Sequence, residues 1–118
     1  MRLLDLRSET AELITNFDST GVSSVKAAMG SGTGHVYNLY FQPGGRIGRH
    51  PAGPAQLFLV VDGTGWVEGE EGTKREIRSG EAAYFAPGET HAKGSNAGMT
   101  AVMIQLDEIE PTAPERER

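Results

Sequence analysis

Two histidines, His50 and His91, are the residues of this sequence with the most chemical potential. An imidazole changes its charge near neutral pH and is also the commonest protein ligand of transition metals. Gln56 follows the first histidine closely, and Glu89 lies just before the second. The absence of cysteine excludes disulfides, thiolate catalysis and cysteine-ligated metal sites. The sequence therefore indicates an imidazole-based site, in which the histidines either bind a metal or hydrogen-bond to a ligand.

Short strands separated by glycine-rich turns must position these side chains. Runs rich in apolar, β-branched and aromatic residues predict strands over 25–29, 35–41, 46–50, 56–61, 66–68, 74–78, 82–85, 90–93 and 99–106. The dipeptide Asp62-Gly63 is a hairpin signal, and the other breaks also contain glycine. No segment has a long 3.6-residue periodicity. This pattern predicts an all-β barrel or sandwich.

Alternation along the strands predicts which side chains face the interior. Residues of equal parity on one strand share a face. An inward-facing His50 therefore predicts the same orientation for Ala52 and Arg46. The side chains expected to converge inside an apolar barrel are His50, Gln56, Phe58, Glu89 and His91.

The stretch Gly44 to Asn96 resembles the two signature motifs of the cupin superfamily, G(x)5HxH(x)3-4E(x)6G and G(x)5PxG(x)2H(x)3N. The matching positions are Gly44, His50, Gly63, Gly80, Gly88 and His91. Four positions depart from the motifs: Ala52 replaces a histidine, Gln56 the glutamate, Ala86 the proline and Ser95 the asparagine. The spacing agrees throughout, and the resemblance covers nearly half of the chain.

The resemblance implies a cupin-type double-stranded β-helix, a jelly-roll-like barrel of two antiparallel sheets. In cupins the corresponding positions bind a divalent metal such as iron, manganese, nickel or zinc. The implied ligands here are His50, Gln56, His91 and Glu89, with Glu89 standing in for the missing motif glutamate. A dioxygenase-like or isomerase-like reaction on a small polar metabolite would suit such a site. The catalytic residues, and whether the protein is an enzyme, stay open.

A metal-free small-molecule binding or sensor module is the alternative. Ala52 offers no ligand, and the neutral amide of Gln56 is a weak one, so the histidines and Gln56 would then orient a ligand by hydrogen bonds. Under either hypothesis Phe58 and Tyr84 are expected to form the pocket wall. Arg46 is expected either to meet an anionic substrate at the barrel mouth or to be an ordinary exposed arginine.

Length and charge limit the remaining possibilities. At 118 residues the chain is expected to form one domain, with an extended lead-in over 1–22, the barrel over 23–107 and a flexible charged tail over 108–118. The net charge of -5, without a basic stripe, argues against a nucleic-acid partner. The lack of a long apolar run argues against a membrane segment, so a cytoplasmic location is expected. A homodimer is expected because the leading strands of cupins often pair with a second subunit.

Overall fold

The structure, a computed structural model, describes residues 1–118 and consists almost wholly of β-strands, as the sequence predicts. Its only helix is a 3-10 turn, η1 (Ser8–Thr10), and no helix is long and apolar enough to cross a membrane. The strands are β1 (Arg2–Asp5), β2 (Glu12–Leu13), β3 (Ser23–Ser24), β4 (Ala28–Phe41), β5 (Arg46–Pro51), β6 (Ala55–Glu68), β7 (Arg75–Arg78), β8 (Glu81–Phe85), β9 (Thr90–Gly94) and β10 (Met99–Pro111).

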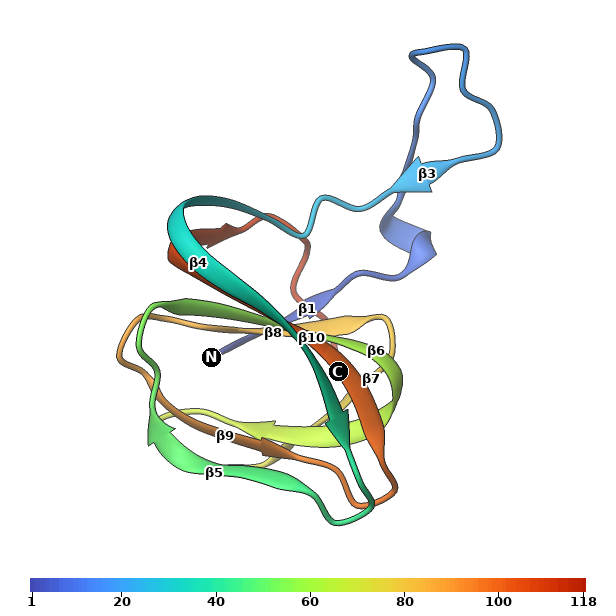
Figure 1. Cartoon of the computed structure of the whole chain (residues 1–118). Helices are drawn as coiled ribbons and strands as arrows, with labels where there is room; N and C mark the ends of the chain where they lie inside the picture. The colour runs from blue at the N-terminus through green and yellow to red at the C-terminus, as the bar shows by residue number, and fades with distance from the viewer.

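Two antiparallel sheets form the barrel (Figure 1). The larger sheet has the order β1-β8-β6-β10-β4. On the opposite side, β9 pairs with both β5 and β6, and β7 pairs with β6. Strand β6 therefore belongs to both sheets: its first part pairs with β8 and β10, and its last part pairs with β7 and β9. This arrangement is the predicted double-stranded β-helix.

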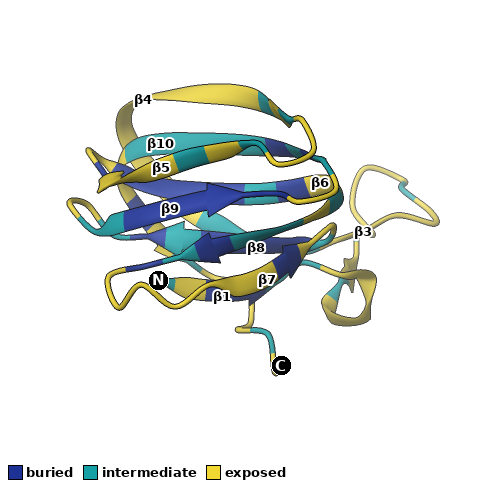
Figure 2. Ribbon diagram, turned by 90° about the horizontal axis from the view of Figure 1, so that it is seen from below, coloured by how far each residue is buried: buried dark blue, intermediate teal, exposed yellow.

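Alternating side chains divide the core into two apolar clusters. The cluster inside the barrel contains Leu3, Phe58, Val60, Val67, Ile77, Ala83, Phe85, Met99 and Ala101. The second contains Leu4, Ala55, Leu57, Ala82, Ile109 and Ala113. Neighbouring residues such as Leu57 and Phe58 belong to different clusters because successive side chains point to opposite faces of a strand. Figure 2 shows that burial concentrates on β6, β8 and β9, whereas β4 and β5 are mostly exposed.

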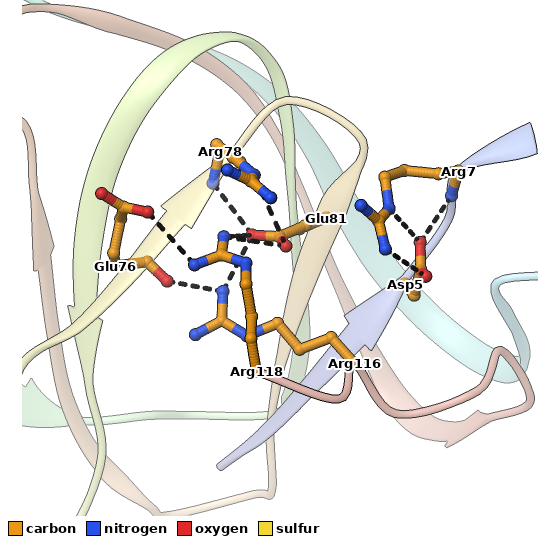
Figure 3. Close-up of polar contacts among 7 residues, drawn as sticks. All are labelled: Asp5, Arg7, Glu76, Arg78, Glu81, Arg116 and Arg118. Carbon is orange, nitrogen blue, oxygen red and sulfur yellow. Dashed lines mark hydrogen bonds and ion pairs between the residues drawn. The ribbon is translucent and has the colours of Figure 1, made fainter.

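Residues 108–118, expected to be a flexible tail, lie against the barrel. Strand β10 continues to Pro111, and the guanidinium groups of Arg116 and Arg118 both approach the carboxylate of Glu81 to 2.8 Å (Figure 3). Glu81 is only 1% exposed. A buried carboxylate is costly unless it is paired, so these two arginines stabilise Glu81 at the start of β8.

A short hairpin formed by β2 and β3 projects away from the barrel (Figure 1). Its large apolar side chains are exposed, with Leu13 at 72%, Phe17 at 90% and Val22 at 50%. Their apolar surface is not covered by the rest of the chain. The expected pairing of this leading segment with a second subunit stays a prediction.

The change of sheet along β6 takes place at Gly63. This residue has a φ of +83°, and a Cβ atom added to it would lie 2.5 Å from the carbonyl oxygen of Gly98. No L side chain fits there without a backbone shift. Gly53, by contrast, has nothing within 4 Å of an added Cβ atom.

We expect Gly63→Ala to lower the free energy of unfolding by about 2 kcal/mol or more, because a left-handed backbone alone costs an L residue roughly 1–2 kcal/mol. Gly53→Ala is the matched control and should change it by less than about 0.5 kcal/mol. Urea denaturation of both variants measures the difference. Equal stability of the two variants would contradict the role assigned to Gly63.

Candidate functional site

The structure brings His50 and His91 together inside one edge of the barrel. They are directly opposite each other in the β5–β9 pair, and their ring centroids are 4.8 Å apart. His91 is fully buried, whereas His50 is exposed. The pair therefore connects the barrel interior to the solvent.

A β-bulge decides which residues of β5 face inward. The pairing register shifts between Ile47, opposite Lys93, and His50, opposite His91. Because directly opposite residues share a face, Ile47 and His50 both face the interior. Simple alternation predicts that Arg46 shares the inner face with His50. Because of the bulge, it does not. Its side chain shares the other face with that of Trp66, because both are opposite Gly94.

Arg46 nevertheless lies at the rim of the barrel. It lines a hollow of about 290 Å³ between the end of β4 and the start of β5, together with Leu39, Phe41 and Ile47. The ring of Phe41 meets the buried ring of Phe58 edge to face, with centroids 6.1 Å apart. The predicted pocket residue Phe58 thus lies behind a residue that lines this hollow, and its ring centroid is 5.1 Å from the amine nitrogen of Lys93.

His91 is a buried imidazole without a hydrogen-bond partner at either ring nitrogen. The ring of Phe85 packs against it edge to face, with centroids 4.4 Å apart. The pKa of His91 is lowered to about 3, chiefly by burial and additionally by electrostatic repulsion from Lys93 and His50. His91 is therefore neutral at pH 7, with one N–H donor and one acceptor nitrogen available to a ligand.

His50 is oriented by its own strand. Its Nδ1 lies 2.6 Å from the carbonyl oxygen of Gly48. A carbonyl can only accept, so Nδ1 carries a hydrogen, and Nε2 is the ring nitrogen left for a ligand.

Lys93 is the principal residue of the site that the sequence reasoning missed. It is only 1% exposed, and its amine donates a hydrogen bond to Oε1 of Gln56. The amine nitrogen also lies 5.1 Å and 4.9 Å from the ring centroids of Phe58 and Phe85. Burial lowers its pKa to about 7. The sequence could have indicated that Lys93 faces the interior, because it lies two residues after His91 and residues two apart on a strand share a face.

Two predicted site residues are held elsewhere. Glu89 Oε2 accepts a hydrogen bond from the α-ammonium group of Met1 at 2.5 Å, and its Oε1 accepts one from the Ala86 amide at 3.0 Å. Tyr84 packs against the second apolar cluster, on the face of β8 opposite to that of Phe85. The structure brings neither residue to the histidine pair, because a tight turn ends just before Thr90 and because alternation turns Tyr84 outward.

The donor set does not fit a resident divalent metal. His50 and His91 supply two nitrogens, whereas catalytic metal sites usually have three protein ligands. The oxygen of Gln56 is bonded to Lys93, and no group of three or more histidine or carboxylate side chains is placed to hold a metal. Lys93 lies near enough to lower the pKa of His91 electrostatically, and a positive charge on its amine disfavours a cation at this site. Binding of a divalent metal, which the family resemblance implies, stays a prediction for this chain.

The fold and the site define the class of this protein: a double-stranded β-helix with polar residues of β5, β6 and β9 inside it. The family model of the cupin domain matches residues 38–106, which is more than half of the chain. The chain therefore belongs to the cupin domain family.

Known proteins resemble the chain in sequence or in fold. An (R)-mandelonitrile lyase from Granulicella tundricola is 37% identical over 70 residues, which cover 58% of this chain and 53% of the relative. The chain thus matches about half the length of this curated relative. A cupin superfamily protein from Desulfitobacterium hafniense superposes with a TM-score of 0.60 at 14% identity, over 92% of this chain and 100% of that one. A cupin-like protein from Thermotoga maritima gives 0.58 at 21% identity, over 66% and 63%. The two structures support the fold alone.

The buried basic groups predict an unusual dependence of stability on pH. The unfolded chain protonates His91 below its ordinary pKa of 6.5, but the folded chain does so only near 3, so stability falls as the pH drops from 6.5 to 3. Between pH 7 and 10.5 the unfolded chain keeps the Lys93 proton and the folded chain does not, so stability rises with pH. We expect denaturation at a series of pH values to show this alkaline rise, and Lys93→Met to remove it. A rise of equal size in the variant would contradict the assignment.

Restoring the motif tests the placement of the incomplete ligand set. We expect the double variant Ala52→His, Gln56→Glu to bind added Zn²⁺ or Mn²⁺ at least about tenfold tighter than the native chain, or ~1.4 kcal/mol. Elemental analysis of tag-free protein and calorimetric titration give the two affinities. The same double variant carrying His91→Ala is the control and should lose the gain. Stoichiometric metal in the native protein would show that the native donors suffice.

Proposed function

We propose that this cupin binds a small polar organic molecule at the His50–His91 pair and transfers a proton to or from it without a resident metal. The observation that carries this proposal is the buried, neutral ring of His91, whose two nitrogens have no partner in the protein. Buried polar atoms are nearly always hydrogen-bonded, so a pair of unsatisfied ring nitrogens indicates a place for a ligand.

The two imidazoles are suited to general acid–base chemistry. A neutral imidazole accepts a proton at one nitrogen and donates one at the other, and such transfer typically contributes about 10²–10⁴-fold in rate. The free Nε2 of His50 is available at the solvent side of the site, and His91 is available inside. A dioxygenase-like reaction would need an open metal position, whereas the proton transfer of an isomerase-like reaction would not.

The mandelonitrile lyase relative supports a lyase reaction as the first one to test. Cleavage of a cyanohydrin begins when a base removes the hydroxyl proton. The carbon–carbon bond to the nitrile then breaks, an aldehyde forms, and cyanide leaves with the electron pair and takes up a proton. One imidazole can serve as the base and return the proton. Since the chain matches only part of that relative, the reaction is our proposal for this chain.

We expect native protein treated with a chelator to release benzaldehyde from (R)-mandelonitrile, measured by absorbance. His91→Ala should lower kcat/KM by about 100-fold or more, because the interior acid–base group is removed. The matched control is His35→Ala, since His35 is an exposed histidine of β4 outside the pair.

Two other outcomes are informative. Binding of small carbonyl compounds without turnover, lost in His91→Ala, would favour the binding or sensor module. Activity that survives in both His50→Ala and His91→Ala would rule out the histidine pair as the site.

A further inference from the structure

Lys93 is a buried amine without a counter-ion. Its polar partner is the neutral amide oxygen of Gln56, and the ring centroids of Phe58 and Phe85 lie 5.1 Å and 4.9 Å from the amine nitrogen. None of the ion pairs of the structure includes Lys93. The carboxylate nearest to it in sequence, Glu89, is bonded to Met1 instead.

The carboxylate of Glu81, which is as buried as Lys93, has charged partners that offset the cost of its burial. Glu81 is 1% exposed, as Lys93 is, but its carboxylate is paired with both Arg116 and Arg118 (Figure 3). Removing a charge from water costs several kcal/mol unless a partner offsets the loss. The fold supplies charged partners for the buried acid, whereas the buried base has an amide and two aromatic rings but no counter-ion.

His91 adds a second unsatisfied group on the same face of β9. It is fully buried, lies two residues before Lys93, and has an N–H that no protein atom accepts. The amine of Lys93 and the imidazole of His91 therefore offer several N–H donors. The acceptors that the protein provides nearby are the oxygen of Gln56 and the unprotonated nitrogens of the histidine rings. This excess of donors suits a ligand that only accepts hydrogen bonds and carries negative charge.

We propose that Lys93 and His91 form a subsite for a small monoanion, reached past the exposed ring of His50. The inference deepens the proposed function, on which it rests: the subsite holds the anionic part of the molecule on which the histidines act. Its ligand is either a carboxylate head group or a free anion such as cyanide. Five surface hollows of the protein are lined by residues other than His91 and Lys93, so the proposed subsite suits a bound group of few heavy atoms.

The test measures anion binding directly, without turnover. Native protein is titrated with sodium formate, acetate and cyanide by calorimetry, with sodium chloride at matched ionic strength as the reference. We expect at least one of the three anions to bind and to raise the denaturation midpoint relative to chloride, because a ligand that binds only the folded state stabilises it. Formate and acetate binding in preference to cyanide assigns the carboxylate source, and the reverse assigns the free anion.

The decisive variant is Lys93→Met, which keeps the length and apolar stem of the side chain. We expect it to weaken anion binding at least tenfold. Lys74→Met is the matched control, because Lys74 is an exposed lysine whose amine lies 4.1 Å from the ring centroid of Trp66, and it should bind like the native protein. If Lys93→Met fails to fold, two other measurements decide the question. The anions should still raise the denaturation midpoint of the native protein, and His91→Phe should bind them more weakly.

Two results would overturn the subsite: none of the three anions has an effect beyond that of chloride, or Lys93→Met binds them as the native protein does. The outcome is separable from that of the proposed reaction. Anion binding that depends on Lys93, without mandelonitrile cleavage, keeps the subsite and rejects the lyase reaction. Mandelonitrile cleavage without anion binding keeps the lyase reaction and rejects the subsite.

Discussion

The barrel depends on one strand, β6, being hydrogen-bonded into both of its sheets. The first part of this strand is the centre of the larger sheet, and its last part is flanked by β7 and β9. Phe58 and Val67 therefore reach the same interior cluster from opposite sides of the barrel. The turn between the two parts needs glycine at Gly63, where the backbone of Gly98 passes too close for a side chain. Once β6 changes sheets, β9 is positioned opposite it, and Lys93 can reach Gln56 across the interior.

The site differs from an ordinary apolar core in its balance of polar groups. Two imidazoles, an amide and an amine meet inside the barrel, and no carboxylate joins them. The same chain pairs its buried Glu81 with two arginines, and the buried side-chain atoms without a hydrogen-bond partner are the two ring nitrogens of His91 and Nε of Arg116. Unpaired polar groups inside a low-dielectric interior reduce stability, and they persist most often where a ligand uses them. This contrast is the physical basis for treating the histidine–lysine cluster as the functional centre.

The family resemblance covers the barrel and leaves both ends of the chain outside it. The cupin domain match spans residues 38–106, whereas the β2–β3 hairpin and the arginines that hold Glu81 lie beyond those limits. The C-terminal segment packs with Leu4 and Leu57 in the second apolar cluster and so covers the outer face of the larger sheet. The interior site thus lies within the matched region, whereas the outer packing combines residues of that region with residues from both ends of the chain.

The sequence by itself determined the all-β fold and the meeting of His50 with His91. Alternating apolar strands separated by glycine leave few other architectures, and the motif spacing places the two histidines on neighbouring strands. Alternation also correctly puts Phe58 and Gln56 on one face. Only the tertiary structure decided the rest: the bulge that turns Arg46 outward, the outer position of Tyr84, the bond between Glu89 and Met1, and the burial of Lys93. A local pattern specifies which face of a strand a residue occupies. The partner of that face depends on the pairing register between strands that are distant in the sequence. A shift of one residue in this register moves a side chain to the opposite face.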